Sequence, residues 1–123
     1  MKTIVLFVIF VLAVCGLATL FVFHGCEDTI KSETRSPGGK YTATVYERDC
    51  GATTDFSTIV SLREASAKFK GDTLGPVIVK GQHKIDLVWN NDTSLRLQCS
   101  DCRPEDIFKQ ERKWKDLEIS FAH

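Results

Sequence analysis

The sequence predicts a mainly β fold: an N-terminal transmembrane or lipoprotein-signal helix, then a small antiparallel β-sandwich or barrel-like domain with at most one short helix. Three observations support this: an uncharged apolar run from Thr3 to Phe23, several short runs of alternating apolar and polar residues, and turn-forming residues between those runs. We divide the 123 residues into an anchor or signal (1–26), a linker (27–35) and an extracytoplasmic β domain (36–123).

The apolar run has the length of a membrane-spanning helix, which needs about 20 apolar residues. Lys2 precedes the run, and Glu27 and Asp28 follow it, so we expect a single pass with the N-terminus inside and the C-terminus outside. An uncleaved anchor is preferred, because the run exceeds the apolar core of about 7 to 15 residues in a secretory signal. Simple secretion is the least favoured alternative.

A second interpretation is a lipoprotein signal that ends at Cys26. The segment Phe23-His24-Gly25-Cys26 resembles a lipobox, in which a small residue precedes the cysteine that is lipidated. Gly25 and Cys26 fit this pattern, whereas Phe23 replaces the usual leucine and His24 replaces a small residue. Cys26 is therefore a candidate for lipidation, and either form of attachment places the remaining chain outside the cytoplasm, in the periplasm or beyond the cell.

The first strands follow polar and turn-forming segments. Residues 27–35 are polar and form a linker or, alternatively, an edge strand. Ser36-Pro37-Gly38-Gly39 predicts a tight turn, since proline presets one turn dihedral and glycine supplies positive φ. Alternation then predicts strands over residues 41–46, 58–62 and 77–80, with a loop over residues 65–76.

The last third of the domain contains the clearest hairpin. Residues 85–89 and 95–99 alternate on either side of an Asn90-Asn91-Asp92-Thr93 turn. Pro104 followed by two acidic residues predicts the first turn of a short helix. Residues 117–121 alternate again and predict a final strand.

Two segments together resemble a group of small, uncharacterised bacterial envelope proteins and lipoproteins. They are Ser36-Pro37-Gly38-Gly39-Lys40-Tyr41 and Asp49-Cys50-Gly51-Ala52-Thr53-Thr54 followed by Phe56, and Ile107 to Glu111 also looks similar to a late strand of that group. Gly38 stands where the group usually has aspartate. The resemblance implies an envelope location and an all-β domain, and it transfers no functional residue.

The outer domain has three cysteines besides Cys26: Cys50, Cys99 and Cys102. Thiols outside the cytoplasm tend to pair, and three cysteines leave one over. We expect a structural disulfide from Cys50 to Cys99 or to Cys102, with direct pairing of Cys99 and Cys102 as the competing possibility. Cys15 lies within the apolar run as a small hydrophobic residue.

The alternative function is that of a thiol-redox or zinc-binding envelope protein using Cys50, Cys99 and Cys102. Cys99-Ser100-Asp101-Cys102 follows a strand and precedes a short helix, the local setting of a dithiol site. His83 could complete a zinc site with the three cysteines. The preferred interpretation nevertheless has no metal and no cofactor.

The preferred function is a membrane-anchored extracytoplasmic binding or interaction module of unknown specificity. The three histidines and the scattered serines and acids form no catalytic pattern, so we expect no enzyme. Mixed charge with a net charge of zero argues against a nucleic-acid partner. The partners expected are the membrane and an envelope protein or cell-wall component. The candidate binding residues surround Cys50 in one loop: Asp49, Gly51, Ala52, Thr53, Thr54, Asp55 and Phe56.

Overall fold

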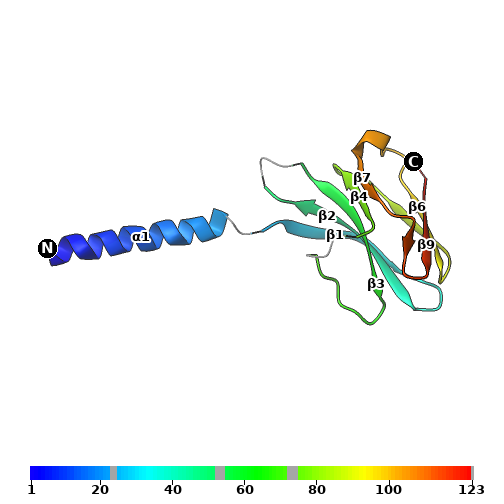
Figure 1. The fold of residues 1–123 in the computed structure, drawn as a ribbon, viewed down its shortest axis with the longest axis horizontal. Helices are drawn as coiled ribbons and strands as arrows, with labels where there is room; N and C mark the ends of the chain where they lie inside the picture. Colours follow the sequence, from blue (N-terminus) through cyan, green and yellow to red (C-terminus); the bar gives the residue numbers. More distant parts are fainter. Residues whose placement is uncertain (23–24, 52–54, 72–74, 123) are drawn as a thin grey trace.

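The computed structural model describes residues 1–22, 25–51, 55–71 and 75–122, and for residues 17–22 it describes the backbone only. The predicted membrane segment forms helix α1 (Lys2–Val22), which extends away from the β domain in Figure 1. Within these described ranges, no helix meets the combined length and hydropathy required to cross a membrane.

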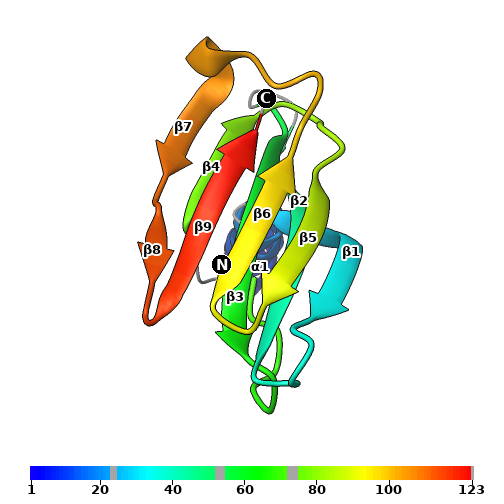
Figure 2. The same cartoon turned by 90° about the vertical axis from the view of Figure 1, so that its right-hand side faces the viewer.

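The described residues outside α1 form two β-sheets. The first sheet has the order β1-β2-β3-β4-β7, and the second has the order β5-β6-β9-β8. Figure 2 shows the second sheet lying across the face of the first, as in a β-sandwich. The strands are β1 (Glu27–Arg35), β2 (Tyr41–Asp49), β3 (Ser57–Glu64), β4 (Val77–Lys80), β5 (Asp86–Asn91), β6 (Ser94–Gln98), β7 (Ile107–Gln110), β8 (Lys113–Trp114) and β9 (Leu117–Ala122).

The main core lies between the two sheets and follows the predicted alternation. Alternate residues of each strand face the core, as Ala43 and Val45 do in β2. Leu95 and Leu97 do the same in β6. Other fully buried members come from β3, β4 and β9, and they include Val60, Val77, Val79 and Leu117. This packing confirms the mainly β prediction.

Strand β2 is buried on both faces, which alternation alone does not predict. Its outward residue Tyr46 is fully buried with Ile59 and Ile78 in a second cluster. Phe69, from the loop after β3, packs on this cluster, and its ring meets the Tyr46 ring edge-on with centroids 5.0 Å apart. The loop therefore covers part of the outer face of the first sheet.

Residues 27–35 form the edge strand β1, which is the stated alternative to the preferred linker. It pairs antiparallel with β2 from Glu27 opposite Asp49 to Arg35 opposite Thr42. Its side chains are largely exposed, so the segment lacks the apolar alternation that identifies a strand. Backbone pairing and the Arg48–Asp28 ion pair, with Nε and Oδ1 2.8 Å apart, hold it on the sheet.

The later elements confirm most of the predicted strands and correct the strand direction. The hairpin β5–β6 pairs Trp89 with Leu95, and a short 3₁₀ helix, η1 (Pro104–Asp106), occupies the predicted helical turn. Strand β9, however, pairs in parallel with β6, with Leu95 opposite Ile119. Along the chain, β7 lies between β6 and β9 and belongs to the other sheet, and β9 then runs beside β6 in the same direction. The prediction of an antiparallel domain is therefore wrong for this one pair of strands.

Candidate functional site

The predicted binding loop is only partly described. Ala52, Thr53 and Thr54 lie outside the described residues, so their role stays a prediction. Asp49 accepts a hydrogen bond from the Gly51 backbone N–H at 3.0 Å, an arrangement typical of a structural turn.

The remaining residues of the loop lie beside β4. The Asp55 carboxylate lies 3.4 Å from Lys80 Nζ, and 37% of the Phe56 surface is exposed. Both residues line a shallow pocket that also includes His83 and Arg103. The described part of the loop thus supplies one exposed ion pair and one partly exposed ring.

The disulfides correct the expected pairing. Cys50 is bonded to Cys26, and Cys99 is bonded to Cys102, so the predicted bridge from Cys50 to the hairpin end is wrong. The register of β1 on β2 explains this, because Glu27 pairs with Asp49, and Cys26 directly precedes Glu27 while Cys50 directly follows Asp49. The predicted pairing placed Cys26 at the end of the membrane segment, so Cys26 was not considered as a partner for Cys50.

The pairing also bears on lipidation. A sulfur atom has a single covalent partner beyond its own Cβ, so Cys26 cannot hold a lipid and the disulfide to Cys50 at once. The structure contains the disulfide form. Lipidation of Cys26 stays an alternative prediction for a different covalent form.

The predicted zinc ligands are not all brought together. Among the described residues, one group of potential metal ligands consists of His83, Cys99, Asp101 and Cys102. Cys50 is absent from it because it is tied to the start of β1, and Asp101 takes its place.

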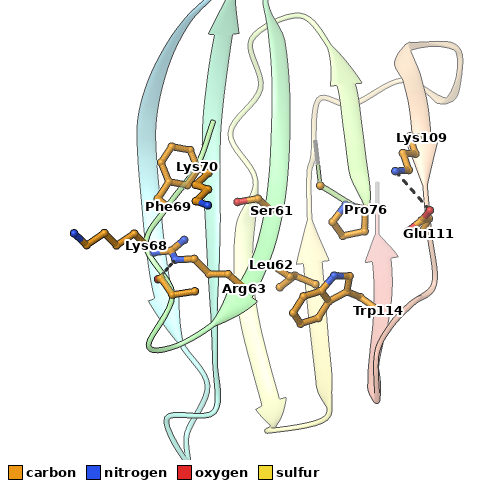
Figure 3. Close-up of a pocket in the computed structure, with 12 residues that line it drawn as sticks. Ser61, Leu62, Arg63, Lys68, Phe69, Lys70, Pro76, Lys109, Glu111 and Trp114 are labelled. Atoms are coloured by element: carbon orange, nitrogen blue, oxygen red, sulfur yellow. Dashed lines mark hydrogen bonds and ion pairs between the residues drawn. The ribbon is translucent and has the colours of Figure 1, made fainter. Parts of the chain in front are cut away.

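A cleft with a volume of about 560 Å³ lies at the second half of β3. Strand β4 pairs with β3 only from Ser57 to Val60, so β3 continues beyond its neighbour. The cleft opens alongside that continuation (Figure 3). Its lining comes from β3, the following loop, β7 and β8, and it comprises Ser61, Leu62, Arg63, Ala67, Lys68, Phe69, Lys70, Gly75, Pro76, Lys109, Glu111 and Trp114.

Arg63 is the structural centre of the cleft. Its guanidinium donates to Thr44 Oγ1 at 2.6 Å and to the Ala67 carbonyl at 3.1 Å, and it lies 3.0 Å from Glu33 Oε2. It also lies over the Phe69 ring, 5.7 Å from the centroid. These contacts hold the start of the loop against the sheet.

The Arg63 guanidinium also changes the acidity of its partner. Its hydrogen bond lowers the pKa of Glu33 below the ordinary value of 4.5, with burial opposing this and Thr44 adding to it. Arg63 is therefore already neutralised within the fold, and the cationic character of the cleft depends on other residues.

Lys68 and Lys70 provide that character. Both side chains are exposed, and neither forms an ion pair or side-chain hydrogen bond within the described ranges. Lys109, by contrast, pairs with Glu111 two residues further along the chain, with Nζ and Oε1 3.5 Å apart (Figure 3). Two uncompensated ammonium groups thus flank Phe69 in the sequence at a cleft whose apolar lining includes Leu62 and Trp114.

Sequence analysis did not identify this cleft as a site. The segment Lys68-Phe69-Lys70 has the basic and aromatic composition of a recognition loop, but its glycines and proline identified it only as a connection. Comparison of the chain with protein-family models, with curated proteins and with solved structures gave no match.

Proposed function

We propose that this protein is a membrane-attached extracytoplasmic binding module whose cleft beside β3 binds an acidic peptide segment of an envelope protein. The observation that carries the proposal is a pair of lysines, Lys68 and Lys70, that form no ion pair with any described residue and lie at a partly apolar cleft of about 560 Å³. That volume lies within the range of about 300 to 1,000 Å³ found for ligand-binding clefts.

The charges favour an acidic ligand. Among the described residues, the lining contains four cationic side chains and a single acidic one, and the acid is paired with Lys109. Because Arg63 is held by Glu33 and Thr44, Lys68 and Lys70 are the cations available to a carboxylate. Complementary charge of this kind directs binding and selects partners.

The shape favours an extended peptide with apolar side chains. The cleft lies beside β3 beyond the residues that pair with β4, so an extended segment bound there would lie next to a strand. Leu62, Phe69 and Trp114 offer apolar surface for alternate side chains of such a segment.

Attachment outside the cytoplasm is supported by the covalent chemistry and the N-terminal sequence. Two disulfides are characteristic of an oxidising compartment. The uncharged segment Thr3 to Phe23, preceded by Lys2, is the proposed attachment, with the N-terminus inside. The resemblance to small envelope proteins would agree with this location.

The test measures binding of a fluorescein-labelled peptide that alternates glutamate and leucine to the full chain in detergent. Lys68→Glu/Lys70→Glu should weaken binding about tenfold or more, a free-energy change of about 1.4 kcal/mol. Lys84→Glu/Arg96→Glu is the matched control, because it makes the same charge change at two exposed positions outside the cleft. The control should bind within about twofold of the unaltered chain.

Equal weakening by both double variants would mean that net charge alone attracts the peptide, which contradicts the proposal. Thr53→Ala/Thr54→Ala separates the cleft from the loop that was predicted first. If that variant abolishes binding while the lysine variant does not, the binding surface is the loop after Cys50. A lysine–leucine peptide should not bind the unaltered chain.

A further inference from the structure

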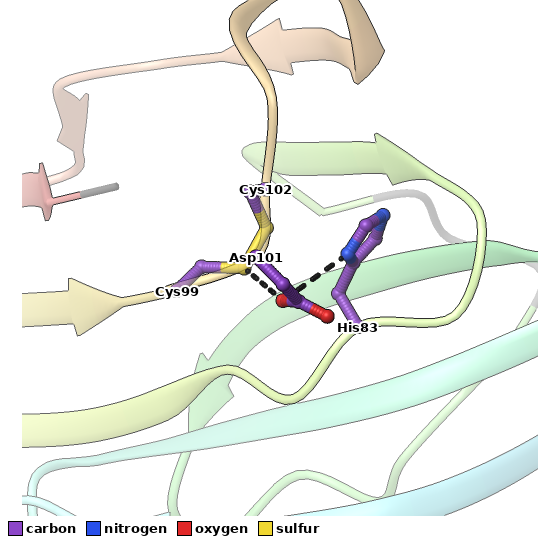
Figure 4. A group of neighbouring side chains, drawn as sticks. All are labelled: His83, Cys99, Asp101 and Cys102. Atoms are coloured by element: carbon purple, nitrogen blue, oxygen red, sulfur yellow. Dashed lines mark hydrogen bonds and ion pairs between the residues drawn. A yellow bond between two sulfur atoms is a disulfide. The ribbon is translucent and has the colours of Figure 1, made fainter.

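A second cluster of reactive side chains lies at the opposite sheet, where the loop after β6 approaches the loop after β4. It consists of His83, Cys99, Asp101 and Cys102, shown in Figure 4. One ligand-type atom from each residue lies within 4.8 Å of the corresponding atoms of the others. This set combines two sulfurs, an imidazole nitrogen and a carboxylate oxygen, all donor types that bind zinc.

The histidine ring is oriented by its neighbours. Nε2 lies 2.8 Å from the Lys80 carbonyl oxygen, which can only accept a hydrogen bond. Nε2 therefore carries the proton, and the lone pair of the neutral ring is on Nδ1. The backbone N–H of His83 donates to Thr58 Oγ1 at 3.0 Å, which fixes the base of the side chain. A protein carbonyl holding the second ring nitrogen is the usual support of a metal-binding histidine.

The Nδ1 atom is buried and has no aligned hydrogen-bond partner among the described residues. Its nearest acidic neighbour is Asp101 Oδ1 at 3.3 Å. The same oxygen lies 3.3 Å from Cys99 Sγ, which has no proton while it is in the disulfide. When the imidazole ring is neutral, three electron-pair donors converge here with no proton between them, an arrangement that a bound cation would stabilise.

We propose that reduction of the Cys99–Cys102 disulfide converts this cluster into a zinc site, with His83 Nδ1, Asp101 and the two thiolates as ligands. The proposal is independent of the cleft beside β3, and it replaces the Cys50-containing site suggested by the sequence. The competing interpretation of this cluster is a purely structural Cys99–Cys102 disulfide next to a His83–Asp101 ion pair.

The chemical step requires a dithiol or phosphine reductant. A dithiol supplies two electrons and two protons, so the sulfur–sulfur bond breaks, two thiols form, and the dithiol becomes a disulfide. A phosphine supplies the two electrons and becomes a phosphine oxide, while water supplies its oxygen and the two protons of the thiols. Zinc then binds the two thiolates and two protons are released to solvent. No other change in oxidation state is involved.

The geometry demands little movement apart from separation of the sulfurs. Zinc–ligand bonds of about 2.0 to 2.3 Å in a tetrahedron place ligand atoms roughly 3.3 to 3.8 Å apart. The widest pair in the cluster must therefore close by about 1 Å. Cys99 and Cys102 are buried, whereas 61% of the Asp101 side-chain surface is exposed, so Asp101 marks the path by which a metal ion would enter.

The first measurement is zinc stoichiometry of the full chain, in detergent, before and after reduction with a phosphine under argon. The reduced chain should retain one zinc ion after dialysis, and the oxidised chain should retain none. Cobalt(II) added in place of zinc should give the absorption of a tetrahedral thiolate complex only after reduction. Zinc should also raise the melting temperature of the reduced chain.

Reduction opens both disulfides, so the variants must separate the two cysteine pairs. Cys26→Ser/Cys50→Ser should keep the zinc and the cobalt spectrum. His83→Gln and Asp101→Asn leave all cysteines in place and should each weaken zinc binding at least tenfold. His123→Gln is the matched histidine control, and it should bind as the unaltered chain does.

Three results would overturn the proposal. One is a reduced chain that retains no zinc, whether folded or unfolded. Another is retention of zinc and the same cobalt spectrum in His83→Gln. The third is loss of zinc in Cys26→Ser/Cys50→Ser while circular dichroism still shows the β fold, since the ligands would then include the other pair.

Discussion

At the scale of single residues, the contacts of Arg63 join three parts of the chain. The guanidinium connects Glu33 of β1, Thr44 of β2 and the Ala67 carbonyl of the loop after β3. Such a polar network is favourable only when each member is paired, as it is here. Alternation predicted the strands on which these residues lie, but the sequence gives no sign of which charged residues meet.

The Glu33–Arg63 pair predicts a pH dependence of stability. The pKa of Glu33 is lowered in the folded state, so its contribution is complete above its ordinary value of 4.5 and is lost as pH falls through the lower folded value. Glu33→Gln should therefore reduce the free energy of unfolding at pH 7 by about 1 kcal/mol or less, because the side chain is partly exposed. Urea unfolding should show a smaller difference at pH 3, and an undiminished difference there would contradict this assignment.

Gly75 illustrates a constraint that involves backbone alone. A Cβ at this position would collide with the backbone carbonyl of Val60, which cannot turn aside as a side chain can. Gly75→Ala should lower the free energy of unfolding by about 1 to 3 kcal/mol. Gly25→Ala, where a Cβ meets nothing within 4 Å, should change it by less than about 0.5 kcal/mol in the same urea titration. Equal changes in the free energy of unfolding for Gly75→Ala and Gly25→Ala would contradict the close approach of Gly75 to the Val60 backbone.

At the scale of elements, predictability follows the apolar pattern. The hairpin β5–β6 alternates clearly and was predicted, as were β2, β3, β4 and β9. The sequence favours a linker over the edge strand β1 because most side chains of this segment are exposed and do not alternate. The segment forms a strand because its backbone pairs with β2. The parallel pairing of β6 and β9 depends on where β7 goes, which no local pattern encodes.

The Cys26–Cys50 disulfide should stabilise β1 on the sheet. It joins residues separated by 24 positions, which corresponds to about 3.5 kcal/mol in the chain-entropy description of the unfolded state. Cys26→Ala/Cys50→Ala should lower the free energy of unfolding by roughly that amount in urea titrations. Cys15→Ala is the control, because Cys15 belongs to neither disulfide, and its stability should be unchanged. Equal stability of the double variant would mean that β1 is held by its backbone pairing alone.

At the scale of the whole molecule, both proposed sites arise where the sandwich is irregular. The cleft opens where β3 outruns β4, and the cysteine–histidine cluster lies where loops after β4 and β6 converge. His83, Cys99 and Cys102 could be predicted from the sequence, because histidine and cysteine are common zinc ligands. Asp101 and the cleft lysines could not be predicted, because charged residues are common and only their neighbours in space mark them as parts of a site.

The proposed location of the β-sandwich is outside the cytoplasm, with its first strand tied to the sheet by the Cys26–Cys50 disulfide and with its N-terminal segment retained. Mass spectrometry of the chain isolated from its native membrane fraction, with thiols blocked before lysis, tests this most directly. We predict a proteolytic peptide pair linked through Cys26 and Cys50, together with an intact Met1 segment. Blocked thiols at both positions, or a diacylglyceryl group on Cys26, would contradict the claim.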